Sequence, residues 1–281
     1  MNPLADQYTL ADLCAAFDVS PSGYHAWVRR LPGLRQLADA ELGTRLCAAH
    51  AASRQTYGSP RLLQALRQQG QRISRRRVRR LMRQNHLQTE APRRFRPQTT
   101  DSRHDSPIAP NHLAEAPAPT GPNQQWVSDI TYVHTGEGWL YVAAVMDLWS
   151  RRIVGLAQAE HMETRLVEQA LEQALCRRGS VGGCIHHSDR GSQYASTRYR
   201  AQVAAAGLEA SMSRAGNCYD NAAMESFWGK LKSELVHRHR FATRQKARLA
   251  IFEHVEVFYN RTRLHSALGF KSPVDFELQL N

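Results

Sequence analysis

The apolar residues of the first 30 positions recur at helical spacing in two short stretches. These stretches cover residues 10–17 and 21–28, with a tight break between them. Ser20 suits the N-cap of the second stretch, and Pro21 suits the first helical position after it. The pattern predicts two helices in a helix-turn-helix outline, although a short helical hairpin with no role in DNA binding has the same pattern.

A second pair of helical stretches begins at Ser59. We expect Ser59 to cap the first of these helices and Gly70 to end it. Ser74 then caps the second helix, and Ile73 and Val78 have the spacing of a hydrophobic staple across that cap. The apolar stripes of the two helices consist of Leu62, Leu63, Leu66, Val78, Leu81 and Met82.

The outward face of the second helix of this pair is strongly basic. It carries Arg75, Arg76, Arg79, Arg80 and Arg83, with no carboxylate interleaved to relieve their repulsion. The charge of the whole chain is similarly lopsided, because residues 1–100 hold 17 arginines and six acidic residues, whereas residues 101–281 hold 20 basic and 19 acidic residues. Such a segment favours contact with nucleic acid phosphates over the alternative, a solvated surface helix with unbalanced charge.

From residue 124 the hydrophobic period changes from that of a helix to that of a strand. Strands are expected at residues 126–133, 139–149 and 152–157, and short connections make this start antiparallel. The expected elements that follow are a helix at about 164–178, a strand at 184–187, a helix at 197–206, a strand at 208–212 and a helix at about 222–237. This order predicts an α/β fold of the α+β type, an RNase H-like mixed five-stranded sheet with flanking helices, preceded by small all-helical helix-turn-helix modules.

The expected organisation has five parts. They are a helical segment at 1–40, a basic helix-turn-helix-like domain at 41–98, a linker at 99–123, the α/β core at 124–237 and a helical extension at 238–281. The linker is rich in proline, so neither helix nor strand is expected there. No apolar run reaches 18 residues and no secretory signal pattern is present, which predicts a cytoplasmic protein. The five cysteines form no C-x-x-C pair, which argues against a disulfide framework and a zinc knuckle.

Three acidic residues lie at positions that could form a metal-binding catalytic site. Asp129 lies inside a β-prone stretch, Asp189 directly follows the strand at 184–187, and Glu225 falls in the first turn of a helix, at the border of its apolar stripe. The alternatives are an aspartate on a wet strand face, a turn aspartate and a solvated glutamate. Together, three carboxylates on separate elements of one core can hold a pair of divalent ions against a phosphodiester. Lys232 lies two turns after Glu225, roughly 10 Å along the same stripe, where it suits a DNA phosphate.

Longer motifs in the second half resemble those of a known family. They are His186-His-Ser-Asp-Arg-Gly-Ser-Gln-Tyr194, Ser211-Met-Ser-Arg214, Gly216-Asn-Cys-Tyr-Asp-Asn-Ala-Ala-Met-Glu-Ser-Phe227, Leu231-Lys232, and the distal Tyr259-Asn260, Arg263, His265, Leu268 and Pro273. The chain resembles bacterial insertion-sequence transposases of the insertion sequence 3 family, which have a retroviral-integrase-like core. By that resemblance Asp129, Asp189 and Glu225 are the DDE triad that binds two Mg²⁺ (or Mn²⁺) ions, and Lys232 matches a basic residue of the motif.

The resemblance implies metal-dependent cleavage and strand transfer of DNA at the ends of an insertion element. The implied partners are the terminal repeats and target DNA, further copies of the chain, and an upstream-frame (OrfA) protein, since this chain looks like the downstream-frame product. The alternatives are a DNA-binding regulator of transposition and an RNase H-like nuclease. Asn260, Arg263 and His265 either lie against DNA or stabilise the C-terminal helices.

Overall fold

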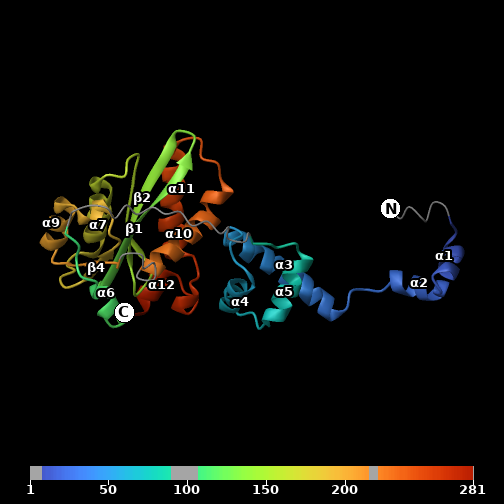
Figure 1. The fold of residues 1–281 in the computed structure, drawn as a ribbon. Coiled ribbons are helices and arrows are strands. Elements are labelled where there is room, and N and C mark those ends of the chain that lie inside the picture. Colours follow the sequence, from blue (N-terminus) through green and yellow to red (C-terminus); the bar gives the residue numbers. More distant parts are fainter. Residues whose placement is uncertain (1–7, 90–106, 215–220, 281) are drawn as a thin grey trace.

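The structure, a computed structural model, describes residues 8–89, 107–214 and 221–280. A helical N-terminal part is followed by an α/β core and a helical C-terminal extension (Figure 1). The helices before the core are α1 (Leu10–Ala16), α2 (Pro21–Val28), α3 (Leu34–Ala52), α4 (Ser59–Gln68) and α5 (Arg75–Gln84). In Figure 1, α1 and α2 lie apart from the rest of the chain.

Local capping determines where the N-terminal helices begin. The predicted cap of α2 is confirmed, because the hydroxyl of Ser20 accepts a hydrogen bond from the backbone N–H of Gly23 at 3.0 Å. Ser74 caps α5 in the same way. The prediction that Ser59 caps α4 is wrong: Gly58 holds the N-cap position and Ser59 is the first helical residue, with no side-chain cap bond.

The long helix α3 has no counterpart among the predicted elements. It runs through residues 40 and 41, where a boundary was predicted between the helical segment at 1–40 and the basic domain at 41–98. Its buried residues Leu42 and Leu46 pack with the predicted apolar stripes of α4 and α5. We call helices α3 to α5 the N-terminal module. Its hydrophobic core also includes Phe258 and Leu264 from the C-terminal extension, so the module is packed onto the rest of the protein.

Hydrogen bonds between side chains and backbone groups connect the N-terminal module to the C-terminal extension. The hydroxyl of Tyr57 accepts a hydrogen bond from the N–H of Leu264 at 2.7 Å, and Arg61 Nε donates to the carbonyl of Leu264 at 2.8 Å. Arg54 forms an ion pair with Glu253. These contacts join positions about 200 residues apart in the chain.

The second half of the expected linker lies within the described residues. It contains the one-turn helix α6 (His112–Glu115), which begins at the N-cap Asn111, although no helix was expected there. Residues 99–106 lie outside the described part of the chain.

The core is a mixed five-stranded sheet, as predicted. Its strands are β1 (Gln125–Thr135), β2 (Gly138–Asp147), β3 (Ile153–Ala159), β4 (Ile185–Ser188) and β5 (Glu209–Met212). They lie in the order β3-β2-β1-β4-β5. The first three strands pair antiparallel, whereas β4 is parallel to both β1 and β5. This is the RNase H-like arrangement that the order of the elements predicted.

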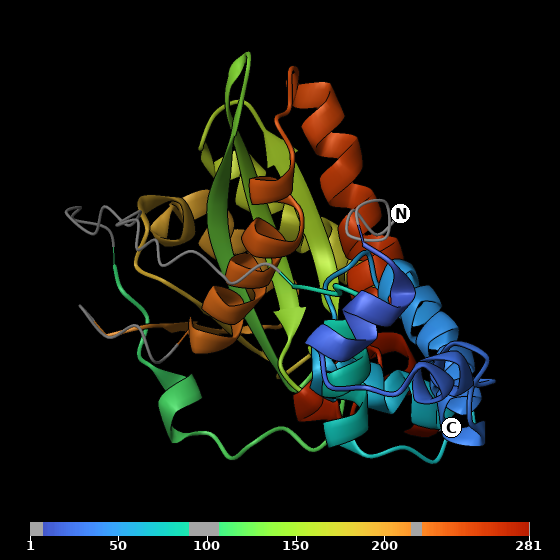
Figure 2. The same ribbon diagram turned by 90° about the vertical axis from the view of Figure 1, so that its right-hand side faces the viewer.

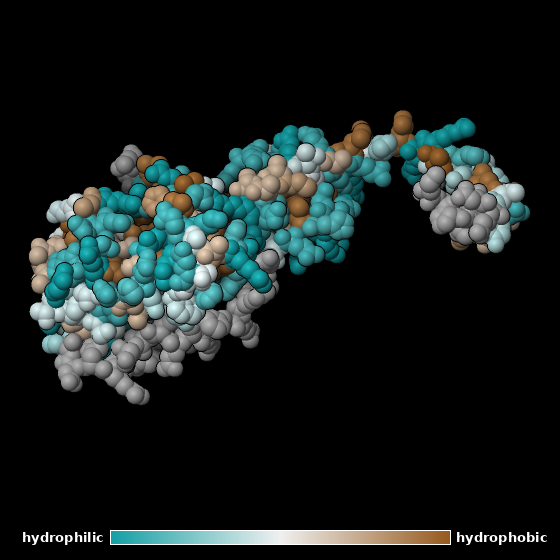
Figure 3. Space-filling view, turned by 90° about the horizontal axis from the view of Figure 1, so that it is seen from above, coloured by the Kyte–Doolittle hydropathy of each residue, from teal (hydrophilic) through white to brown (hydrophobic). Residues whose placement is uncertain are grey.

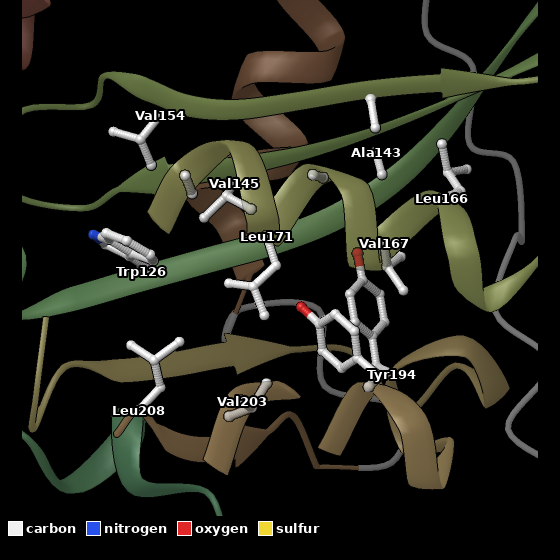
Figure 4. Close-up of a cluster of buried hydrophobic side chains, with 14 of the residues drawn as sticks. Trp126, Ala143, Val145, Val154, Leu166, Val167, Leu171, Tyr194, Val203 and Leu208 are labelled. Carbon is white, nitrogen blue, oxygen red and sulfur yellow. The ribbon is translucent and has the colours of Figure 1, made fainter. Parts of the chain in front are cut away.

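Helices cover both faces of this sheet. One face is covered by α7 (Thr164–Arg178), α8 (Ser192–Ala195) and α9 (Thr197–Ala205), and Figure 4 shows Trp126, Val145 and Leu171 in the apolar layer between them. The contact is close at Gly155 of β3, where a Cβ atom would lie 2.0 Å from the carbonyl oxygen of Ala170. This position therefore requires glycine.

The other face is covered by α10 (Ala222–Glu234) and α11 (Arg244–Glu253), as Figure 2 shows. Met224, Leu231 and Ile251 are fully buried against the strands. A 3-10 turn at Val236–Arg238 lies between α10 and α11. After α11 the chain continues through a π-helical turn at His254–Tyr259, a 3-10 turn at Ser266–Leu268, α12 (Pro273–Glu277) and a 3-10 turn at Leu278–Leu280.

The segment that joins α2 to α3 exposes large apolar side chains. Leu31 is 85% exposed and Leu34 is 88% exposed. Figure 3 shows hydrophobic residues on this narrow stretch, between the isolated helices and the main body. Within the described ranges, every helix is too short or too polar to cross a membrane.

Candidate active site

Asp129 and Asp189 lie at corresponding positions of two neighbouring parallel strands. β1 pairs with β4 from Gln125 opposite Ile185 to Val127 opposite His187. The same register, continued by two residues, sets Asp129 opposite Asp189. Asp189 thus directly follows the carboxyl end of its strand, where functional residues of α/β sheets commonly gather. The sheet therefore brings together two of the three predicted carboxylates.

The surroundings of Asp129 keep its carboxyl group protonated at neutral pH. Burial raises its pKa to about 8, and the negative charges of Asp189 and, more weakly, Glu225 add to this shift. Carboxyl groups that repel one another in a poorly solvated place are stabilised when a cation neutralises them. This electrostatic pattern fits a divalent metal ion.

Two hydrogen bonds orient the carboxylate of Asp129. Trp228 Nε1 donates to Oδ2 at 3.1 Å, and the backbone N–H of Ile130 donates to Oδ1 at 2.9 Å. Both bonds lower the pKa of Asp129 and so oppose the effect of burial. Trp228 was not among the predicted site residues. Its indole N–H was the available signal, because a buried tryptophan usually needs an acceptor.

The loop after β4 holds Asp189. The backbone N–H of Gly191 donates to Asp189 Oδ1 at 2.9 Å. A Cβ atom on Gly191 would lie only 3.0 Å from that oxygen, so the close approach depends on glycine. The strand itself is anchored by two buried histidines. His187 hydrogen-bonds Ser211 and Ser213 at 2.8 and 3.0 Å, whereas burial lowers the pKa of His186 to about 3 and keeps it neutral.

Glu225 lies in the first turn of α10 and is exposed. Asn221 holds the N-cap position without a side-chain cap bond, and its Nδ2 donates to the carbonyl of Ser128 at 3.4 Å. This bond ties the start of α10 to β1, beside Asp129.

Within the residues that the structure describes, no group of three or more His, Cys, Asp or Glu side chains has the geometry to hold a metal ion. The aspartates are neighbours in the sheet, whereas Glu225 does not join them at a single ion in this structure. The donors nevertheless have the chemistry that Mg²⁺ and Mn²⁺ prefer, since all three are carboxylates. Asp129, Asp189 and Glu225 are the residues that could hold such ions.

Lys232 lies close enough to Asp129 to interact with its charge. Its Nζ atom is 5.3 Å from the centre of the Tyr132 ring on β1. Burial lowers the pKa of Lys232, and the charge of Asp129 opposes that shift. The lysine is thus a half-buried cation at the edge of the carboxylate site, on the helix that carries Glu225.

The arginines predicted to contact DNA do not all share one environment. Arg75, Arg76, Arg79 and Arg83 are exposed on α5. Arg80 is instead half-buried and pairs with Asp39 of α3 at 2.7 Å, and the neighbouring Arg77 pairs with the same carboxylate at 2.8 Å. Asp39 was missed because it belongs to a helix that the sequence pattern did not predict.

The three distal residues whose role was open lie in the interior. Asn260 and Arg263 are each 1% exposed, and His265 is 5% exposed. Asn260 bonds both the N–H and the carbonyl of Ile153 at 3.0 Å, at the start of β3. Arg263 binds the carboxylate of Glu234 through Nε and Nη2. The contacts of Asn260 and Arg263 thus stabilise the C-terminal helices, and Nη1 of Arg263 has no hydrogen-bond partner among the described residues.

Comparison with known families agrees with this architecture. Residues 36–95 match the HTH-like domain, and residues 119–218 and 206–273 match integrase core domains. The helical module, the RNase H-like sheet and these matches define a transposase or integrase of the DDE class.

Relatives specify the family. The chain is 47% identical over 264 residues to an insertion element IS600 uncharacterized 31 kDa protein of Shigella sonnei, covering 94% of this chain and 97% of the relative. It is 39% identical over 273 residues to the transposase InsF for insertion sequence IS3A of Escherichia coli (strain K12), covering 96% and 94%. The chain belongs to the IS3 family of transposases.

Solved structures with similar folds are viral integrases of low sequence identity. A simian T-cell lymphotropic virus intasome in complex with PP2A regulatory subunit B56 gamma has a TM-score of 0.49 at 14% identity, covering 83% of this chain and 74% of that chain. The BIV integrase catalytic core domain has a TM-score of 0.42 at 16% identity, covering 56% and 95%.

Proposed function

We propose that this transposase cuts and joins DNA at the ends of its own insertion element, using divalent ions held by Asp129, Asp189 and Glu225. The observation that carries the proposal is the parallel register of β1 and β4, which pairs Val127 with His187 and which, continued by two residues, would set Asp129 opposite Asp189. The raised pKa of Asp129 supports it, because the charges of both partners contribute to that shift.

The residues of the chain have distinct tasks in this proposal. Asp129 must lose its proton to become a ligand, and Trp228 holds its carboxylate in a defined orientation. Gly191 does the same for Asp189. When bound, divalent ions of such a site activate the attacking oxygen and stabilise the departing 3′-oxygen. Lys232 is placed to hold a backbone phosphate beside them, so no nucleophilic serine or tyrosine is required.

The direct test is a nicking and joining assay on labelled duplexes that carry the ends of the element, with Mg²⁺ or Mn²⁺. Asp129→Asn, Asp189→Asn and Glu225→Gln should each lower both rates by about 10³-fold or more, since ligands of one site act as a unit. Glu209→Gln provides a matched control, because Glu209 is an exposed carboxylate on β5. A triad variant that binds the duplex and nicks it at the wild-type rate would refute the proposal.

The exposed arginines of α5 favour a second candidate, a regulator that acts only by binding DNA. In that case Asp129→Asn would retain the complete biological function, including control of transposition in cells. A hybrid of RNA and DNA, offered in the same assay, distinguishes a transposase from an RNase H-like nuclease. We expect cleavage of the element ends and no preference for the hybrid.

We further propose that activity requires several copies of the chain and is increased by the upstream-frame protein. The exposed Leu31 and Leu34, beside helices that lie apart from the main body, support a partner at this segment. Adding the upstream-frame protein to the joining assay should raise the yield. The variant Leu31→Ser, Leu34→Ser should lose this stimulation while its basal nicking is unchanged.

A further inference from the structure

A cavity of about 450 Å³ separates the N-terminal module from α10. Figure 1 shows the module on the side of the core where α10 lies. Arg61 of α4 lines the cavity from the module, and Lys230 of α10 and Arg263 of the C-terminal extension line it from the core. The only acidic side chain among its lining residues is Glu234.

Arg263 is the deepest of these cations. It is 1% exposed, and Glu234 engages its Nε and Nη2 atoms. The remaining nitrogen, Nη1, is buried and has no hydrogen-bond partner among the described residues. A buried guanidinium nitrogen without an acceptor is costly, so an anionic or polar ligand in the cavity would stabilise this atom.

Hydrogen bonds also hold Arg61 and Lys230 in place. Arg61 Nε donates to the carbonyl of Leu264 at 2.8 Å, and Lys230 Nζ donates to the hydroxyl of Ser226 at 2.7 Å. Burial lowers the pKa of Lys230 to about 8, and repulsion from Arg263 and Arg61 adds to this shift. These three cations, which line the cavity together with Lys232 and Arg238, are therefore close enough to repel one another, and the carboxylate of Glu234 does not balance them.

The shape of the cavity indicates how a ligand would enter. Gly229 lines it on the face of α10, and a Cβ atom there would meet nothing within 4 Å. Ser226 also lines it and directly follows Glu225 in the sequence. A chain-like ligand in this cavity would thus lie along α10 within one helical turn of the predicted catalytic glutamate.

We propose that Arg61, Lys230 and Arg263 form a subsite for a backbone phosphate of the DNA strand that leads to the active site. This inference rests on the proposed function, in which DNA is the substrate of the active site that includes Glu225 of α10. Phosphate oxygens match both the unpartnered guanidinium nitrogen and the point charge of lysine. Because Arg61 belongs to the N-terminal module, one phosphate there would contact the module and the catalytic core together.

The test measures binding rather than cleavage, so its failure differs from failure of the proposed function. In EDTA, the affinity for an element-end duplex is measured against salt concentration. Lys230→Gln should weaken binding and reduce the slope of log K against log salt by about one phosphate contact, roughly 0.9. Lys246→Gln, at an exposed lysine on α11 outside the cavity, provides the matched control. Equal slopes for the two variants would overturn the proposal.

A second arm locates the phosphate. Single phosphates of the duplex are replaced in turn by uncharged methylphosphonate. One position should weaken binding of the wild type several-fold yet have no further effect on Lys230→Gln. If no position shows this coupling, the subsite does not hold a DNA phosphate. Stabilisation of the wild type, but not Lys230→Gln, by inorganic phosphate alone, with no such coupling, would likewise refute DNA as the ligand.

A third variant guards against misfolding. Gly229→Gln places a side chain in the cavity without removing any contact that the structure shows. It should weaken DNA binding like Lys230→Gln while its melting temperature stays equal or rises, since glutamine favours a helix more than glycine does. Wild-type DNA affinity in Gly229→Gln would contradict occupation of the cavity.

Discussion

Asp129 stands opposite Asp189 when the register that joins Trp126 to His186 is continued along β1 and β4. Burial raises the pKa of the Asp129 carboxyl to about 8, and Asp189 is the strongest charged contributor to that shift after burial. Without a cation the charge of Asp189 therefore opposes the ionisation of Asp129.

The first prediction concerns stability without metal. Below about pH 4 the carboxyl of Asp129 is protonated in the folded and the unfolded protein. Between about pH 4 and pH 8 only the folded protein keeps this proton, so its contribution to the free energy of unfolding decreases as pH rises through this window. Asp129→Asn removes the effect. The melting temperature of the wild type relative to that of Asp129→Asn, measured in EDTA, should fall with rising pH, and a constant difference would contradict the shift.

The second prediction concerns Trp228. Trp228→Phe keeps an aromatic side chain but removes the N–H that lowers the pKa of Asp129. The pKa should rise further, so the pH at half-maximal metal-dependent nicking should move upward, with a rate loss of about 10- to 100-fold near neutral pH. Trp149→Phe is the control, because Trp149 packs against Phe276 elsewhere. An unchanged pH profile for Trp228→Phe would show that the hydrogen bond has no role in the reaction.

The third prediction concerns the glycine beside Asp189. In Gly191→Ala the new methyl group would lie 3.0 Å from Asp189 Oδ1 and 3.1 Å from Gln193 Oε1, so the carboxylate must move. We expect nicking to fall by about 10- to 100-fold, since small displacements of reacting groups have effects of this size. Gly182→Ala is the matched control, because its Cβ would meet nothing within 4 Å. Equal activity of the two variants would argue against a constrained carboxylate.

The fourth prediction concerns packing of the sheet against α7. Gly155→Ala would place a methyl group 2.0 Å from the carbonyl oxygen of Ala170, and the backbone of a helix cannot yield like a flexible side chain. The free energy of unfolding should fall by about 1–3 kcal/mol or more. Urea denaturation of this variant and of Gly182→Ala provides the comparison. A loss in Gly155→Ala no larger than in the control would contradict the close contact.

The fifth prediction separates two arginines of α5. Arg76→Gln removes an exposed cation, so it should weaken DNA binding and reduce the salt slope by roughly 0.9 without a change in stability. Arg80→Gln removes a partner of Asp39, so it should lower the melting temperature and have the smaller effect on the salt slope. Asp39→Asn should resemble Arg80→Gln in stability. The reverse ranking of the two arginines would show that the Arg80 ion pair breaks when DNA binds.

The core could be predicted from the sequence because its elements are strongly periodic. The predicted helix from Thr164 to Arg178 has the bounds of α7, and the bounds of the first three predicted strands lie within two residues of those of β1, β2 and β3. The helix α3 escaped prediction because Leu34 and Leu37 at its start are exposed, so its apolar face is incomplete. Without α3, the partner of Arg80 could not be known.

The candidate site was likewise predicted only in part. Asp129, Asp189 and Glu225 stand out by their type and position, and they remain the predicted triad. The indole N–H of Trp228 and the group formed by Arg61, Lys230 and Arg263 depend on contacts between distant segments. Such contacts cannot be predicted from local sequence patterns, because the N-terminal module and the C-terminal extension come together only when the chain folds.

The bonds of Tyr57 and Arg61 to Leu264 hold the N-terminal module at a fixed distance from the core. Since α4 and α5 are fixed to the body that bears Asp129, the proposed DNA-binding face of α5 lies at a set spacing from the proposed cleavage site. Inserting or deleting base pairs between those two places in an element end would then misalign one with the other, and five base pairs, about half a turn of the double helix, would turn the scissile bond away from the carboxylates.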